Sequence, residues 1–253
     1  MVFFVLLPIV FSPIMKKVIG LYILLTIIAL NSCSAQSGSK AGKKKAVAEA
    51  KAETETKSEK MTEVLIKTSK GNIRIALYNE TPQHRDNFIK LVKENYYDNV
   101  LFHRIIKNFM IQTGDPDSKT AKPGQRLGSG GPGYRIPAEF VPTVYHRRGA
   151  VAAARDNNPP KSSSASQFYI VDGQVYDNAY LDMVEQRTGK KFSAEQREVY
   201  TTVGGAPFLD GDYTVFGQVL SGMEVVDKIA AQPKDANDRP MEDIRIISMK
   251  VIE

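Results

Sequence analysis

The stretch FHRIIKNFMIQTGD, residues 102–115, holds two apolar runs, 102–106 and 109–111, joined by a polar pair of residues. These runs predict two short β-strands, yet Arg104 and Gln112 interrupt them. Because side chains alternate between the faces of a strand, each of these two polar residues shares its face with apolar neighbours two positions away. If the strands pair, a guanidinium and an amide lie together among apolar groups, which is an unusual place for a permanent charge.

The pattern around this stretch predicts a mainly β domain. Residues 63–68 and 72–77 alternate with period two around a turn with Gly71, which indicates a hairpin. Thr81-Pro82 predicts the start of a helix, with Thr81 as its cap. Further strands are expected at 102–106, 109–113, 150–154, 167–171, 214–219 and 244–252, and a second helix at 223–230. Many short strands with few helices are typical of an antiparallel barrel or sandwich.

The chain has 253 residues, of which 42% are hydrophobic and 25% charged, enough for one sizeable domain or two small ones. Its net charge of +6 is uneven, because residues 1–61 hold nine lysines and four glutamates and so carry +5. The remainder is nearly neutral. Without clustered basic residues it gives no footprint for nucleic acid, and we exclude that class of partner.

An export signal is predicted at the N-terminus. Residues 16–33, KKVIGLYILLTIIALNSC, contain two lysines, an apolar stretch from Val18 to Leu30 and then small polar residues. The apolar stretch is short for a membrane span, which needs about 20 residues. We therefore expect a cleaved signal peptide at 1–32, with Met15 as the natural start and 1–14 as an over-extended gene prediction.

LNSC at residues 30–33 resembles the lipobox of bacterial lipoproteins, in which the cysteine is lipidated and becomes the first mature residue. The alternatives are a chance cysteine or an uncleaved anchor formed by residues 2–30. The lipoprotein interpretation places the protein at a membrane, facing the periplasm. Cys33 is the single cysteine of the chain, which leaves none for a disulfide, a thiol nucleophile or a cysteine-based metal site.

Residues 33–61 are rich in Ser, Ala, Lys, Glu and Thr and have almost nothing to bury. Such a segment is expected to be a flexible tether between the lipidated N-terminus and the folded domain. Its basic run has two interpretations, contact with anionic lipid headgroups or a solvated linker.

Five blocks of sequence resemble cyclophilins and occur in the cyclophilin order. They are FHRIIKNFMIQTGD at 102–115, GSGGPGY at 128–134 followed by Glu139, GAVAAAR at 149–155, SQFYI at 166–170 and FLDGDYTVFGQV at 208–219. The resemblance covers residues 62–253 and implies a closed eight-stranded antiparallel barrel with a helix over each end. It also implies peptidyl-prolyl cis-trans isomerase (rotamase) activity, with proline-containing polypeptides as partners and no cofactor or metal.

The resemblance assigns a catalytic role to Arg104 and Gln112. Isomerisation needs a donor that stabilises the twisted amide nitrogen of an X-Pro bond more than the planar one. Arg104 would supply that donor, while Gln112 would orient Arg104 and bind the substrate carbonyl. The alternative for Arg104 is a purely structural pairing with a carboxylate.

Nine further positions match the substrate-binding residues of the family. They are Phe109, Met110, Ala154, Arg155, Gln167, Tyr169, Phe208, Leu209 and Tyr213. Strict alternation puts Phe109 and Met110 on opposite faces, so Phe109 needs a local twist to reach the proline pocket.

Three of these positions depart from the best-known eukaryotic pattern. Phe208 replaces tryptophan, Tyr213 replaces histidine and Arg155 replaces asparagine. An aromatic wall remains, but loss of the indole donor is expected to weaken binding of the family's cyclic peptide inhibitor. The charge of Arg155 suggests a preference for acidic residues near the proline, and equal rates on Glu-bearing and Lys-bearing peptides would remove that hypothesis.

Other motifs have plainer interpretations. GSGGPG at 128–133 fits G-x-G-x-x-G, but its prolines favour a turn over a dinucleotide site. His84, His103 and His146 lack metal-ligand spacing and are interpreted as surface or strand histidines. No metal site is predicted.

Residues 172–207 form an insertion between two binding blocks, with helices expected at 177–186 and 193–200. The second helix opens with a Ser193–Gln196 capping box. The insertion is expected to border the substrate groove, where it either sets specificity or shields the barrel.

The sequence thus predicts a monomeric isomerase that assists the folding of exported proteins. The alternative is a non-catalytic holdase that retains unfolded chains in the same groove.

Overall fold

A hairpin opens the part of the chain that the computed structural model describes, residues 60–252; the predicted signal peptide, Cys33 and nearly all of the tether lie outside it. Strands β1 (Thr62–Thr68) and β2 (Gly71–Leu77) pair in antiparallel register, as predicted. Val64 and Ile66 are fully buried and alternate with more exposed residues. Gly71 has φ +141°, a turn conformation that favours glycine.

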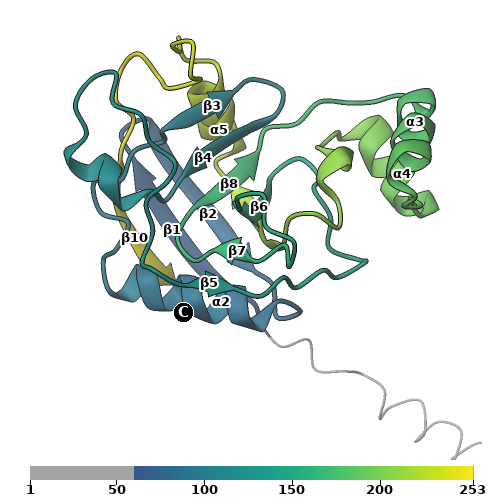
Figure 1. Cartoon of the computed structure of the whole chain (residues 1–253), viewed down its shortest axis with the longest axis horizontal. Coiled ribbons are helices and arrows are strands. Elements are labelled where there is room, and N and C mark those ends of the chain that lie inside the picture. The colour runs from purple at the N-terminus through teal and green to yellow at the C-terminus, as the bar shows by residue number, and fades with distance from the viewer. Residues whose placement is uncertain (1–59, 253) are drawn as a thin grey trace, which may run out of the picture. The chain divides into compact units, whose positions relative to one another are not determined.

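Eight strands form one curled antiparallel sheet, in the order β10-β1-β2-β9-β6-β8-β4-β3 (Figure 1). The remaining strands of this sheet are β3 (Arg104–Ile106), β4 (Met110–Thr113), β6 (Ala150–Ala153), β8 (Phe168–Val171), β9 (Val215–Ser221) and β10 (Ile246–Ile252). A separate two-stranded ribbon pairs β5 (Arg135–Ile136) with β7 (Ser163–Ser164). The mainly β prediction is confirmed.

The prediction of a closed barrel is wrong, because the sheet is an open half-barrel whose edge strands β3 and β10 do not pair within the described residues. Scattered backbone bonds span the gap instead, such as Phe102 N–H to the Ile244 carbonyl at 2.9 Å and Ile105 N–H to the Asp238 carbonyl at 2.8 Å. The segment 233–241 that faces β3 contains two prolines, which cannot donate to a ladder.

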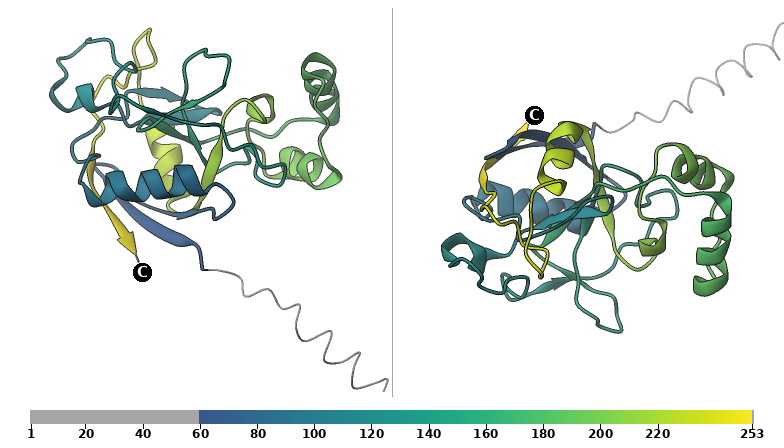
Figure 2. Two further views of the ribbon diagram at one scale, coloured as in Figure 1. Left: turned by 60° about the horizontal axis from the view of Figure 1, so that its bottom comes forward. Right: turned by 90° about the horizontal axis from the view of Figure 1, so that it is seen from above.

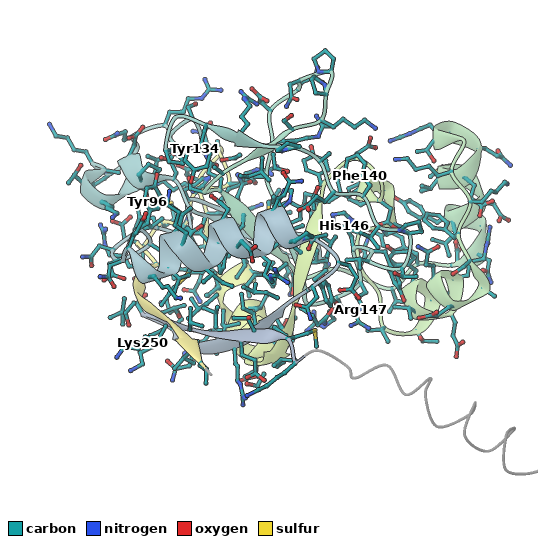
Figure 3. The ribbon with its side chains drawn as sticks, turned by 90° about the horizontal axis from the view of Figure 1, so that it is seen from below. Tyr96, Tyr134, Phe140, His146, Arg147 and Lys250 are labelled. Carbon is teal, nitrogen blue, oxygen red and sulfur yellow. The ribbon has the colours of Figure 1, made fainter. Side chains whose placement is uncertain are left out.

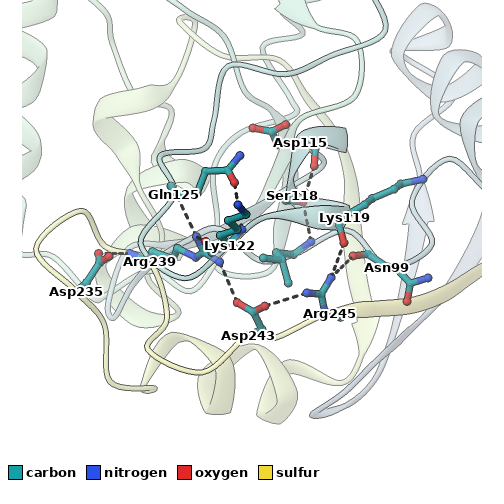
Figure 4. Close-up of polar contacts among 11 residues, drawn as sticks. Asn99, Asp115, Ser118, Lys119, Lys122, Gln125, Asp235, Arg239, Asp243 and Arg245 are labelled. Atoms are coloured by element: carbon teal, nitrogen blue, oxygen red, sulfur yellow. Dashed lines mark hydrogen bonds and ion pairs between the residues drawn. The ribbon is translucent and has the colours of Figure 1, made fainter.

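Arginine side chains hold the loops across this gap (Figure 4). Arg239 is buried and donates to the carbonyls of Lys122 and Gln125 at 2.9 and 3.0 Å and to the Asp243 carboxylate at 3.1 Å. Arg245 donates to the same carboxylate at 2.9 Å. Side-chain bonds to loop carbonyls therefore replace the missing ladder.

Helices α2 (Pro82–Lys93) and α5 (Met223–Ala230) pack at opposite ends of the curled sheet (Figure 1). Thr81 is the N-cap residue of α2 and Pro82 its first residue, as predicted, but the Thr81 hydroxyl makes no capping bond. The Glu139 carboxylate accepts from the Gln83 and His84 N–H groups at 3.1 and 3.0 Å. A carboxylate suits the positive end of the helix dipole better than a hydroxyl.

The insertion contains helices α3 (Asn178–Thr188) and α4 (Ala194–Thr202), which lie side by side away from the sheet (Figure 2). The predicted capping box at Ser193 is present. The ends of the insertion meet where Gln174 pairs with Gly205. A Cβ on Gly205 would lie 2.2 Å from the His146 carbonyl oxygen, so this close approach requires glycine.

The main core lies between the inner face of the sheet and the helices α2 and α5. Phe88 of α2 meets Phe168 of β8 edge to face, with ring centres 5.2 Å apart, an arrangement that aromatic pairs prefer. Short 3-10 turns, η1 (Pro116–Thr120) and η2 (Pro207–Leu209), complete the fold. None of the helices in residues 60–252 combines the length and apolarity needed to cross a bilayer.

Candidate active site

The β3–β4 hairpin carries the two residues that the sequence predicts to be catalytic. Arg104 on β3 lies directly opposite Gln112 on β4. The row continues across the sheet, because Gln112 is opposite Tyr169 on β8 and Tyr169 is opposite Ala152 on β6. Directly opposite side chains project from the same face of an antiparallel pair. The guanidinium and the amide therefore share a face, as the alternation predicts.

The sheet is apolar on both faces in this region. Ile105 and Ile111 are fully buried in the main core on the inner face. Met110 and Tyr169, which alternate with inward-facing residues, belong to a second apolar cluster on the outer face. Arg104 thus stands at the edge of an outer apolar surface.

Phe109 reaches this outer cluster because it belongs to the hairpin turn and not to β4. Asn108 before it adopts the left-handed conformation, with φ +64°. The Phe109 carbonyl then accepts from the N–H groups of Asp172 and Gly173 at 3.0 and 3.1 Å. These bonds supply the local twist that period-two alternation could not predict, and they place Phe109 with Met110 in one cluster.

The outer cluster gathers seven of the nine predicted binding residues. They are Phe109, Met110, Ala154, Tyr169, Phe208, Leu209 and Tyr213. The rings of Phe109 and Phe208 are 5.4 Å apart, and those of Tyr169 and Tyr213 are 6.0 Å apart. We call this cluster the apolar groove.

A polar hollow of about 520 Å³ adjoins the apolar groove. Gln112, Ala154, Arg155 and Gln167 line it, together with the glycine-rich loop 128–133. The Gln112 amide donates to the Gln167 side chain at 3.1 Å, and Gln167 donates to the Gly130 carbonyl at 2.8 Å. In the described structure Gln112 therefore bonds Gln167 and not Arg104. The glycine-rich motif forms a loop with no helix after it, as its interpretation as a turn requires.

Arg104 has one ionic partner within residues 60–252. Its Nε lies 3.4 Å from Oδ2 of Asp238, and the Arg104 side chain is 41% exposed. The Asp238 backbone is in turn fixed by the Ile105 N–H, which donates to its carbonyl at 2.8 Å. An exposed pair of this kind contributes little stability, about 0–1 kcal/mol. Asp238 was not found from the sequence, because it lies in a loop with no periodicity.

Arg155 is held at the junction of the hollow and the apolar groove. Its Nε donates to the Asp212 carbonyl at 2.6 Å and its Nη1 to the Asp156 carbonyl at 2.9 Å. The guanidinium lies 4.8 Å from the ring centre of Tyr213, a cation–π contact. All these partners are neutral, so Arg155 keeps its net positive charge beside the hollow.

A chain of hydrogen bonds ties the insertion to the apolar groove. The Tyr200 hydroxyl of α4 donates to Oδ2 of Asp210 at 2.5 Å, and Oδ1 of Asp210 is 2.7 Å from Nδ1 of His146. Nε2 of His146 is 2.9 Å from the Tyr169 hydroxyl. Figure 3 shows His146 between the sheet and the insertion helices. A lone histidine gives no sequence signal for such a role, so the sequence did not predict the position of His146.

The interpretation of the three histidines as surface or strand residues is wrong, because all are buried and none lies in a strand. His84 lies in α2, where Nδ1 is 2.6 Å from Glu139 and Nε2 is 3.0 Å from the Ser163 hydroxyl. Burial lowers the pKa of His84, and Glu139 partly opposes this. Burial also lowers the pKa of His103 to about 4. Across residues 60–252 no group of His, Cys, Asp and Glu is placed to hold a metal ion.

Comparison with known proteins agrees with this geometry. Residues 63–251 match the family model described as cyclophilin type peptidyl-prolyl cis-trans isomerase/CLD. A relative from Aspergillus fumigatus, peptidyl-prolyl cis-trans isomerase-like 1, is 33% identical over 193 residues, covering 76% of this chain and 96% of its own. A putative peptidyl-prolyl cis-trans isomerase from Staphylococcus aureus is 32% identical over 192 residues, covering 76% and 92%.

A solved structure has the same fold. It is a cyclophilin type peptidyl-prolyl cis-trans isomerase from Cryptosporidium parvum, with a TM-score of 0.56 and 26% identity, covering 77% of this chain and 99% of its own. A further crystal structure of that protein was obtained in the presence of the dipeptide Ala-Pro. The match of the family model and of these relatives over the whole described domain leads to one conclusion. The chain belongs to the cyclophilin-type peptidyl-prolyl cis-trans isomerase family.

Proposed function

We propose that this protein accelerates cis-trans isomerisation of X-Pro bonds in unfolded exported polypeptides, with Arg104 as the catalytic donor. Amide resonance imposes a barrier of about 18–20 kcal/mol on that rotation. At the twisted geometry the prolyl nitrogen regains its lone pair and can accept a hydrogen bond. A donor aimed at that nitrogen stabilises the twisted amide more than the planar one and so lowers the barrier.

The observation that carries this proposal is the position of Arg104 at the edge of the apolar groove. Its one ion pair within residues 60–252 runs through Nε to Asp238 at 3.4 Å, which leaves the two terminal nitrogens of the guanidinium for a substrate. Gln112 shares its face and binds the carbonyl that precedes the proline. Gln112 would orient Arg104 by packing beside it on the same face, because the two residues are directly opposite in the β3–β4 pair.

The remaining predicted residues divide into two parts of one binding surface. The aromatic and aliphatic side chains of the apolar groove form the cradle for the pyrrolidine ring, a role supported by Phe109 and Met110 in one cluster with Tyr213. Gln167 and Arg155, which line the polar hollow, bind the chain on the N-terminal side of the proline.

The location is proposed from the sequence alone. The signal peptide at 1–32, a lipid on Cys33 and the tether at 33–61 would hold the domain at a membrane facing the periplasm, where it meets newly exported chains as a monomer. Replacement of Cys33 by serine should abolish incorporation of labelled fatty acid into the protein. Retention of the label by Cys33→Ser would exclude the lipoprotein assignment.

The experiment that tests the catalytic role compares the full-length wild type with Arg104→Ala in a protease-coupled assay on a proline peptide. Loss of a preorganised donor typically costs about 100-fold to 1000-fold in rate, and we expect a fall in kcat/KM of that order. Arg74→Ala is the matched control, because Arg74 pairs with Glu63 on the β1–β2 hairpin, far along the sheet order from β3. It should keep the wild-type rate.

Equal rates for Arg104→Ala and wild type would show that the assignment of Arg104 is wrong. The second candidate function, a non-catalytic holdase, predicts that result together with retained peptide binding. Absence of measurable isomerase activity in the wild-type protein would also favour the holdase.

A further inference from the structure

Helix α3 of the insertion lines a cavity together with Phe208, a residue of the apolar groove. Tyr180, Met183, Val184 and Arg187 of α3 follow helical spacing and line one side of a cavity of about 190 Å³. Phe208 of η2, which contacts α3, lines the other side. Met183 is 49% exposed, so the cavity opens to solvent through an apolar rim.

The cavity shares one wall, Phe208, with the apolar groove. Phe208 belongs to the groove cluster, and its ring is 5.4 Å from that of Phe109. A polypeptide with its proline against Phe109 therefore passes Phe208 within a residue or two. The solvent-facing rim at Met183 is where the side chain of a neighbouring residue would enter the cavity.

The lining groups share one chemical preference. Tyr180 and Phe208 contribute aromatic side chains to the lining, the Met183 thioether makes favourable contacts with aromatic rings, and the Arg187 guanidinium suits a cation–π contact. Arg187 forms no ion pair with any residue from 60 to 252, so its charge is available to a ligand. An engineered apolar cavity of about 150 Å³ binds benzene, which shows that this volume suits an aromatic ring.

We propose that this cavity is a specificity subsite for an aromatic side chain on the C-terminal side of the substrate proline. The inference rests on the proposed function, because it takes the proline to lie in the apolar groove. The direction follows from the positions of the two ends of the site. Gln112, which receives the carbonyl before the proline, opens into the polar hollow, whereas Phe208 lines the cavity and not the hollow.

The test measures isomerisation of four blocked peptides by exchange NMR with the full-length protein, so that no protease preference enters. The peptides carry Phe or Ala two residues after the proline, or Phe or Ala directly before it. For wild type we expect Phe after the proline to raise kcat/KM about tenfold over Ala. Met183→Glu places a carboxylate in the cavity rim and should reduce that ratio to below about twofold.

Gln186→Glu is the matched control, since Gln186 is an exposed residue of the same helix that does not line the cavity. It should keep both the rates and the tenfold ratio. A ratio below twofold in wild type, an undiminished ratio in Met183→Glu, or a larger gain from Phe before the proline would each overturn the subsite.

A binding measurement separates failure of the subsite from failure of the proposed function. The chain has no tryptophan, so the fluorescence of a peptide with Trp in place of the Phe reports binding without protein background. If no peptide is isomerised, the proposed function fails. The subsite is then still judged by a tenfold tighter Kd for the Trp peptide over the Ala peptide, with the Ala peptide measured by competition, and by loss of that advantage in Met183→Glu.

Discussion

Arg239 belongs to the loop of residues 235–243 and Arg104 pairs with it, but the two guanidinium groups are held in opposite ways. Arg239 is buried and each of its terminal nitrogens is bonded, to two carbonyls and to Asp243. Arg104 is 41% exposed, and its one ion pair within residues 60–252 joins Nε to Asp238 at 3.4 Å. A guanidinium that is saturated holds a structure together, whereas one that keeps free donors beside an apolar surface is available to a ligand. This contrast supports the proposed catalytic role of Arg104 over a purely structural pairing.

The largest effect on stability should come from the saturated arginine. Arg239→Ala leaves the Lys122 and Gln125 carbonyls without their donor and removes a partner of Asp243. Loss of such a buried group should lower the free energy of unfolding by about 3 kcal/mol. Urea unfolding measures it, and Arg104→Ala should change the same quantity by less than about 0.5 kcal/mol. Equal losses in the two variants would break the comparison.

His103 lies beside both arginines and sharpens the contrast through pH. The pKa of His103 is lowered to about 4, chiefly by burial. The charge of Asp115 opposes this shift, and the charges of Arg104 and Arg239 add to it. Because the folded pKa is below the unfolded value of 6.5, the unfolded state takes up a proton first as pH falls. The contribution of His103 to the free energy of unfolding is therefore fully present above pH 6.5. It is lost between pH 6.5 and 4, by about 3 kcal/mol in total.

The measurement is the free energy of unfolding of wild type and His103→Phe at several pH values in that window. His103→Phe keeps an aromatic ring but cannot titrate, so its curve should be flatter. His84, whose pKa burial also lowers, supplies the remaining slope. Parallel curves for the two proteins would show that His103 does not carry the pH dependence.

The smallest effect should come from the contact between Arg104 and the loop. Asp238 has φ +64°, which glycine and asparagine also adopt, so Asp238→Gly and Asp238→Asn keep the backbone. Asp238→Gly should lower kcat about threefold with little change in KM, because Arg104 loses its one ionic partner among residues 60–252. Asp238→Asn, which can still accept a bond from Nε, should restore most of the rate. A rise in KM with unchanged kcat would mean that Asp238 acts on binding and not on the orientation of Arg104.

Much of the fold was predictable because it follows local periodicity. The strands around Val64 and Ile75 alternate cleanly, and the amphipathic face of α2 around Phe88 was visible in the sequence. The open edge of the sheet was not predictable. It depends on where the segment before β10 meets residues that precede it by more than 100 positions, and neither end of that contact is periodic.

The site was predictable where residues match family blocks and unpredictable where partners come from loops or from the insertion. Arg104 and Gln112 fall opposite each other because a short hairpin fixes their register. Asp238 and Tyr200 come from segments without a matching block. The acceptor at the start of α2 was missed for a similar reason, since Glu139 comes from a loop more than 50 residues away and accepts the bonds that the Thr81 hydroxyl does not.

The central claim is that Arg104 stabilises the twisted amide and not the bound peptide as such. The most direct test measures, for wild type and Arg104→Ala, both the Kd of a proline peptide and its cis-trans exchange rate on the protein under saturation by NMR. We expect the Kd to change by less than about threefold while the exchange rate falls at least about 100-fold. An exchange rate that is unchanged, or that falls only in proportion to affinity, would contradict the account.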